Sequence, residues 1–153
     1  MKASLKIKDS ARKQLSEVIR RMGDAGPALN VIGEIVHESI QTNFEDGGRP
    51  RPWKLLSPAT IAQRKKSGHW PGRILVRKGV SGGLMGAVSY RAFNNKVVWT
   101  ANKVYAAIHN YGGQAGRGRK VTIPGREFML IQDEDWQEID ETMKDFIVMG
   151  NVS

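Results

Sequence analysis

The run GGQAGRGRK at residues 112–120 combines four glycines with three cations, residue types that can cradle a phosphate group. A phosphate-binding loop needs Gly, four residues, Gly, and then Lys with Ser or Thr, because the lysine binds phosphate and the hydroxyl binds magnesium. Gly113 and Gly118 have this separation, but Arg119, Lys120 and Val121 follow them. The lysine is displaced and no hydroxyl follows it, so the spacing argues against nucleotide binding.

Histidine and carboxylate spacing offers no better candidate for catalysis. His37 opens the run HESIQ, where a zinc protease helix needs a second histidine and has Gln41 instead. His69 lies in a predicted loop, and we expect His109 to hydrogen-bond a backbone carbonyl. The chain has no cysteine, and residues 47–126 contain no Asp or Glu to hold the metal ions of a nuclease. The sequence therefore predicts no enzyme, no catalytic residue, no metal site and no cofactor.

The elements that must position the glycine run are predicted from apolar spacing and from Pro and Gly positions. Helical spacing is found at 10–22, 27–44, 58–66, 104–111 and 133–149, and strand spacing at 84–90, 97–99, 121–123 and 128–131. This order predicts a single α+β domain over residues 1–153, with a small antiparallel β-sheet packed against α-helices. A long N-terminal helix and an acidic C-terminal helix are expected.

The bulk composition is that of a folded domain, with 153 residues of which 40% are hydrophobic and 25% charged. The opening MKASLKIKDS lacks the apolar core of a signal peptide, and no stretch approaches the roughly 20 apolar residues of a membrane span. We therefore expect a soluble cytoplasmic protein with no membrane partner.

Charge is strongly segregated along the chain, whose net charge is +9. Residues 47–126 carry 16 of the 24 Lys and Arg, whereas residues 127–153 carry eight acids and one lysine. Either the acidic C-terminal part folds back on the basic middle, or the complementarity is satisfied between copies. A nucleic-acid-binding module is a further alternative, because the basic residues alternate with aromatic ones that can stack on bases, namely Trp53, His69, Trp70 and Trp99.

Four segments of the chain occur in one order, a combination that unrelated proteins should not match by accident. They are Phe44 with Gly47-Gly48 and the run PWKLLS at 52–57; ILV at 74–76 with Gly79 and Leu84; YAAIHNYGG at 105–113; and IPGREF at 123–128. Together they resemble the phage virion morphogenesis family, also called tail completion proteins. Gly79 and Leu84 are further apart here than in the family, and Glu127 replaces a proline.

The resemblance implies a structural protein of tail completion or head–tail joining. Such a protein forms a ring with other copies, with six as a candidate number, and contacts other phage head–tail or tail proteins. It is made in the host cytoplasm and ends in the virion, at the head–tail joint or the end of the tail. Non-specific contact with DNA in the lumen of the ring is left open.

Site residues are assigned on this basis as hypotheses. We expect residues 112–120 to form a flexible basic loop that presents Arg117, Arg119 and Lys120 to a neighbouring copy or to DNA. The acids opposite them in the next copy would be Asp133, Glu134 and Asp135.

The remaining assignments are structural and follow the resembling segments. Trp53 and Leu55 are expected to anchor the connector after residue 46 on the core, and Tyr105, Ile108 and Tyr111 to be core residues. His109 and Gly112 should shape the exit into the loop, and Arg126 and Phe128 should fix the returning strand.

Overall fold

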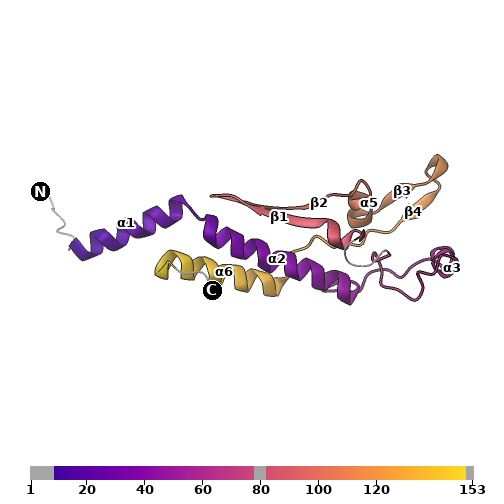
Figure 1. Ribbon diagram of the computed structural model, residues 1–153, viewed down its shortest axis with the longest axis horizontal. Coiled ribbons are helices and arrows are strands. Elements are labelled where there is room, and N and C mark those ends of the chain that lie inside the picture. The colour runs from indigo at the N-terminus through magenta and orange to yellow at the C-terminus, as the bar shows by residue number, and fades with distance from the viewer. Residues whose placement is uncertain (1–8, 78–81, 151–153) are drawn as a thin grey trace, which may run out of the picture.

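The computed structural model describes residues 9–77 and 82–150, so Gly79 lies outside the described residues. The molecule is elongated around α2 (Gly26–Asp46) (Figure 1). Helix α6 (Asp133–Met149) lies along α2, and the antiparallel hairpin of β1 (Val88–Ala92) and β2 (Val97–Ala101) packs against α2 as well. Helix α1 (Asp9–Gly23) projects beyond one end of α2.

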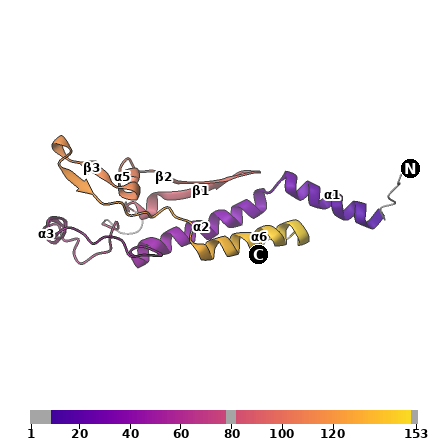
Figure 2. The same cartoon turned by 180° about the vertical axis from the view of Figure 1, so that it is seen from behind.

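The opposite end of the molecule divides into two arms, which Figure 2 shows from behind. One arm is the connector, residues 47–57, with α3 (Pro58–Lys66). The other is α5 (Ala106–Tyr111) with a second antiparallel hairpin, β3 (Gly113–Ala115) and β4 (Val121–Ile123). Single 3-10 turns lie before β1 and at the tip of the second hairpin, namely η1 (Met85–Ala87) and η2 (Arg117–Arg119). The predicted α+β class is confirmed.

Helix α2 carries the core because its apolar residues recur every four positions and so lie on one face. That face is buried from one end of the helix to the other: Ala28, Ile32, Val36, Ile40 and Phe44. The helix ends where Gly47 takes a φ of 75°, the left-handed conformation that glycine adopts without strain.

The first hairpin packs on α2 at a position where only glycine fits. A Cβ on Gly33 would lie 2.3 Å from Cδ2 of Tyr90. The cross-strand partner of Tyr90 is Trp99, whose Nε1 donates to the Gly33 carbonyl at 3.0 Å. The missing side chain therefore lets one aromatic ring lie on the helix and another bond to its backbone.

The C-terminal end of α6 is held by α1. Arg21 donates from Nη1 to the carbonyls of Ile147 and Val148, at 3.0 and 3.1 Å. These are carbonyls of the last helical turn, which favours a cation beside it.

The strand predicted at 128–131 is wrong, because this segment bonds to side chains instead of to a neighbouring strand. The amide of Asn43 donates to the carbonyls of Glu127 and Phe128, at 3.3 and 3.2 Å. Asn110 accepts from the N–H groups of Phe128 and Met129, at 3.0 and 3.1 Å. Two buried amides therefore hold an extended segment that leads into α6.

The flexible basic loop expected at 112–120 includes a short strand. Gly113–Ala115 pairs with Val121–Ile123, in a register that places Gln114 opposite Thr122. The run is thus one strand and the turn of a hairpin. Mobility of its tip in the isolated subunit stays a prediction.

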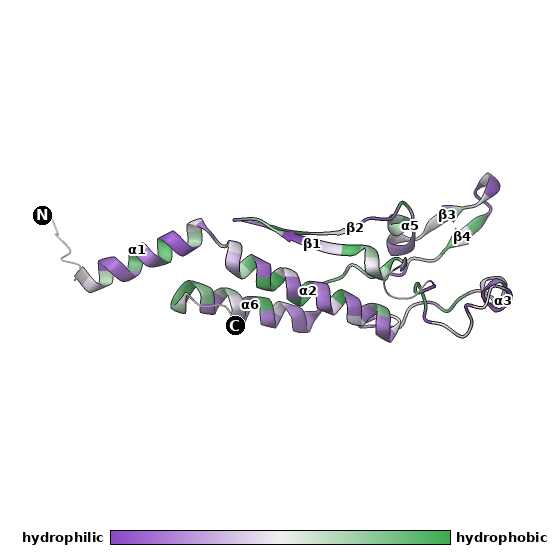
Figure 3. Ribbon diagram, in the orientation of Figure 1, coloured by the Kyte–Doolittle hydropathy of each residue, from purple (hydrophilic) through white to green (hydrophobic). Residues whose placement is uncertain are grey.

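Hydrophobic residues are not confined to the core (Figure 3). In α1 the apolar residues sit among charged ones, and Leu15, Ile19 and Met22 are more than half exposed. Within residues 9–77 and 82–150, no helix combines the length and apolar character needed to cross a bilayer.

Candidate interaction surfaces

The charge segregation of the sequence is retained in space. In the described part of the chain, Arg49 is the one cation of residues 47–126 that pairs with an acid. It lies 3.2 Å from Glu134 on α6 and 3.9 Å from Asp46. Within the described residues, the acidic C-terminal part therefore forms one ion pair with the basic middle, while its helix α6 packs on α2 and α1.

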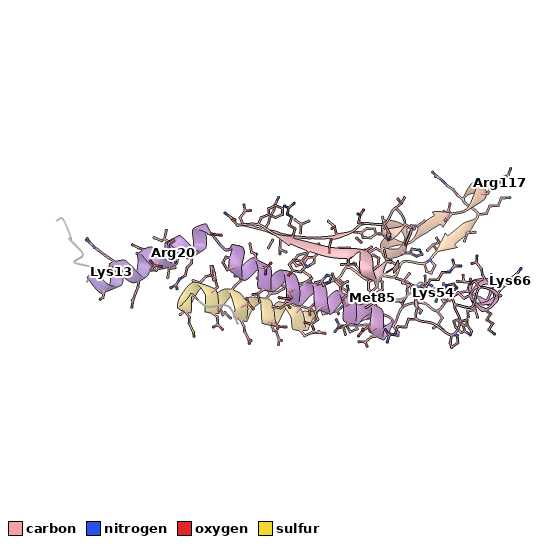
Figure 4. All side chains as sticks on the ribbon, viewed as in Figure 1. Lys13, Arg20, Lys54, Lys66, Met85 and Arg117 are labelled. Atoms are coloured by element: carbon pink, nitrogen blue, oxygen red, sulfur yellow. The ribbon has the colours of Figure 1, made fainter. Side chains whose placement is uncertain are left out.

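The tips of both arms are basic. Arg117, Arg119 and Lys120 are exposed at the turn of the second hairpin, and Lys65 and Lys66 are exposed on α3. Figure 4 shows Arg117 and Lys66 at the same end of the molecule and Lys13 and Arg20 at the other. The three predicted interface cations are thus placed where another molecule can reach them.

The three predicted interface acids have different environments. Asp133 is exposed on the first turn of α6, while Glu134 pairs with Arg49 of its own chain. Asp135 is 5% exposed, and its Oδ2 accepts from the N–H of Gln132 and the hydroxyl of Ser39, both at 2.7 Å. An interface role for Asp135 is wrong, because the carboxylate caps α6 and joins it to α2.

A cleft of about 1050 Å³ lies between the two arms. Its apolar lining comes from both of them and includes Leu55, Leu56, Leu75, Tyr105, Val121 and Ile123. The charged residues that line it within 9–77 and 82–150 are all cationic: Lys54, Arg64, Arg77, Lys103 and Arg126. A space of this size and mixed lining is large enough to take a side chain or a short segment of another molecule.

Two of the cleft arginines are deeply buried, Arg64 at 6% and Arg126 at 5% exposure. Arg64 donates from Nη1 to the carbonyl of Arg73 at 2.8 Å. Arg126, on the hairpin arm, reaches across to the connector and donates to the carbonyls of Lys54 and Leu55, at 2.9 and 3.2 Å. Neither guanidinium forms an ion pair with a described carboxylate.

The pKa values of the two buried arginines are lowered in this cationic surrounding. Burial lowers the pKa of Arg64, and the positive charge of Arg77 lowers it further. Burial and then the charge of Arg64 lower the pKa of Arg126 in the same way. In the part of the chain that the structure describes, the cleft is therefore a cationic site without a counter-ion.

His109 lies beside this site and is half-buried. Its pKa is lowered by burial first and by Arg126 second. The buried Nδ1 has no hydrogen-bond partner among the described residues, so the predicted bond from the ring to a carbonyl is wrong. The backbone carbonyl of His109 instead accepts from the N–H of Arg126 at 2.8 Å.

Comparison with known proteins decides the family. A family model described as the phage virion morphogenesis family matches residues 8–147. The chain belongs to this family. Membership supports a structural role in phage assembly and confirms the resemblance that the four segments indicated.

Two curated relatives of this virion morphogenesis chain come from Mu-like elements. "Mu-like prophage FluMu G protein 2" of Haemophilus influenzae is 29% identical over 150 residues, which cover 93% of this chain and 95% of the relative. "Putative capsid assembly protein G" of Escherichia phage Mu is 26% identical over 118 residues, 74% of each chain. No solved structure matches significantly.

Of the residues that carried the family resemblance, some are buried in the core and others are exposed. Trp53 is 8% exposed, packs its ring on Phe44 at 5.7 Å and donates from Nε1 to the carbonyl of Glu127 at 3.2 Å. Phe128 is fully buried in the same cluster. Leu55 does not anchor the connector, because it is 79% exposed at the cleft and the buried indole fixes the connector instead.

Helix α5 lies in the third of the resembling segments, and the face that it buries differs from the expected one. Tyr105 and Tyr111 are 44% and 80% exposed, so neither is a core residue. Helix α5 begins after Tyr105 and buries the face of Ala106 and Asn110. Gly112 takes a φ of 79° with an extended ψ of 176°, so it turns the chain directly into β3 instead of capping with a left-handed helical residue.

Three functional residues were missed in the sequence. Asn43 and Asn110 hold the segment before α6, and Arg64 is the buried member of a run of three cations. Asn43 could have been found from the sequence, because it lies among the apolar residues of α2 and a buried amide needs hydrogen-bond partners.

Proposed function

We propose that this protein is a non-catalytic phage assembly protein that forms a ring, at the head–tail joint or in tail completion, through contacts of one subunit face with a different face of the next. The observation that carries the proposal is the spatial separation of the basic arms from the acidic surface of α6. Because one described ion pair joins the two regions, most of the complementarity is available to another copy. Contacts between unlike faces close into rings when the rotation allows it.

The exposed apolar stripe of α1 supports contact with other virion proteins or copies. Leu15, Ile19 and Met22 recur at helical spacing and are 54%, 61% and 66% exposed. Val148 and Met149, at the end of α6 that contacts α1, are 71% and 65% exposed. A grouped apolar surface of this kind is typical of an interaction site.

The experiment that tests the assembly role is removal of the gene from an inducible prophage, followed by electron microscopy of the lysate. Heads and tails that remain unjoined, or tails of uncontrolled length, are expected. Rescue by the wild-type gene supplied in trans is the control. Normal infectious virions in the absence of the gene would contradict the proposal.

A second candidate function, contact with nucleic acid, is favoured by the cations at the hairpin tip. Arg117, Arg119 and Lys120 are clustered and exposed, and phosphate contacts need such side chains. A gel shift with duplex DNA tests this function. Affinity that falls with the logarithm of salt and is weakened by R117A/R119A/K120A would support it, whereas no shift at low salt would reject it.

A further inference from the structure

We propose that the cleft between the two arms receives a stripe of α6 from a neighbouring copy, with Trp136 entering the cleft and Asp133 and Asp140 facing its cations. This inference rests on the proposed function and names the contact that builds the assembly.

Among the described residues, no anion lines the cleft. Arg64 and Arg126 are more than nine-tenths buried, and their described bonds are to backbone carbonyls. A carbonyl accepts a hydrogen bond but does not neutralise the charge, and burying an uncompensated charge is costly. The exposed cations Lys54, Arg77 and Lys103 at the same cleft increase the repulsion. A ligand with carboxylates would relieve it.

The cleft also needs an apolar partner. Leu55 is 79% exposed and Val121 56% exposed on its walls. Phosphate alone would neutralise the arginines but would leave these side chains in water. A protein segment that carries a large apolar side chain between carboxylates satisfies both requirements, which favours a protein over nucleic acid as the occupant.

Helix α6 presents such a segment. Trp136 is 56% exposed, although tryptophan is normally well buried. Asp133 and Asp140 precede and follow it by three and four residues, so all three lie on one helical stripe. Both acids are exposed, and Asp140 also pairs with Lys144 of its own helix. This stripe is turned away from the buried face of Asp135, Thr142 and Phe146. Tryptophan and arginine are also the residues that dominate the energy of protein interfaces.

The contact must be made between copies. Trp136 does not line the cleft of its own chain, and Figure 1 shows α6 lying along α2 while the arms extend past the end of that helix. The other exposed apolar helix, α1, is a poorer occupant because Arg12, Lys13, Arg20 and Arg21 would add cations to a cationic cleft. The α6 stripe of a second copy matches the cleft in both charge and apolar surface.

The first test compares variants by light scattering over a concentration series. W136A and R77E are expected to weaken self-association by roughly 10-fold or more, as loss of a central interface residue does.

Two matched controls are Y111A, which truncates an exposed aromatic residue outside the cleft, and E138K, which has the net charge of D133K but lies on another stripe. Y111A should leave association unchanged, and E138K should weaken it less than D133K. The double variant R77E/D133K should recover part of the loss of each single variant.

The second test uses the absence of cysteine from the chain. Q63C places a thiol at the cleft and Q137C places one beside Trp136. A short bis-maleimide should link the two variants to a covalent dimer when they are mixed, and should link either variant alone much less. W136A in the Q137C chain should reduce this product.

The outcomes separate the inference from the proposed function. If the wild-type protein assembles but W136A and R77E assemble equally well and the mixture does not cross-link, the inference is overturned and the ring proposal stands. If the wild-type protein does not associate at any concentration and gene loss leaves virions intact, both fail. If R77E abolishes DNA binding and leaves the oligomer mass unchanged, the cleft binds nucleic acid and the inference is again overturned.

Discussion

Arg126 joins the two arms of the molecule while sharing their cleft with Arg64. Its guanidinium bonds the carbonyls of Lys54 and Leu55 across the cleft, and the nearby charge of Arg64 lowers its pKa. The same side chain therefore fixes the geometry of the cleft and supplies part of its positive charge. This double role gives a function to a buried arginine that bonds backbone carbonyls and no described carboxylate.

R126A is expected to lower the free energy of unfolding by about 2–4 kcal/mol. It removes two buried charge-assisted hydrogen bonds and leaves two carbonyls without donors. Urea unfolding followed by circular dichroism measures the change. R117A is the matched control, because Arg117 is exposed at the hairpin tip and its loss should cost less than about 0.5 kcal/mol. Equal stability of the two variants would refute the role of Arg126 in joining the two arms.

G33A is expected to destabilise the fold by about 1–3 kcal/mol, because the new Cβ would overlap the ring of Tyr90. G23A is the control, since a Cβ at Gly23 has nothing within 4 Å. The double variant G33A/Y90L should recover part of the loss. A G33A protein as stable as wild type in thermal unfolding would show that the hairpin does not pack as described.

D135A is expected to cost about 2–3 kcal/mol, since it leaves the N–H of Gln132 and the hydroxyl of Ser39 without their acceptor. D133A removes a neighbouring exposed acid and should cost less than about 1 kcal/mol. Denaturant midpoints of the two variants distinguish the cap from general helix-terminus electrostatics. The prediction fails if D133A lowers the denaturant midpoint more than D135A does.

Stability should fall as pH is lowered through the range of histidine titration. The pKa of His109 is lowered in the folded protein, so below the unfolded value of about 6.5 the unfolded chain binds the proton more readily. The free energy of unfolding is therefore highest above that pH and decreases toward the folded pKa. H109Q should reduce the loss between about pH 7.5 and 5.5, measured by urea midpoints. If H109Q loses as much stability as the wild-type protein over this pH range, the burial assigned to His109 is wrong.

The sequence predicted the elements whose apolar periodicity is strong. The apolar spacing at 27–44, 58–66 and 97–99 has a local physical cause, and the structure has α2, α3 and β2 at these places. The strand expected at 128–131 failed because the backbone groups of that segment bond to Asn43 and Asn110, which are distant in the chain. Local propensity carries no information about such partners.

The candidate site was harder to predict than the fold. Arg64 stands in the run RKK, and composition does not tell which of three adjacent cations is buried. Leu55 and Tyr111 are apolar, yet they are exposed, because connectors and short helices bury only the side that meets the core. The segregation of charge, in contrast, was visible in the sequence and persists in space, since one described ion pair joins the two regions.

In the proposed assembly, copies associate through unlike, oppositely charged faces. Molar mass by light scattering at about 50 mM and about 500 mM salt tests it most directly, because higher salt screens exposed charges. We expect a defined oligomer at low salt that is weakened at high salt and by D133K, and is partly restored in R77E/D133K. A protein that stays monomeric at low salt, or an oligomer indifferent to salt and to both substitutions, would contradict it.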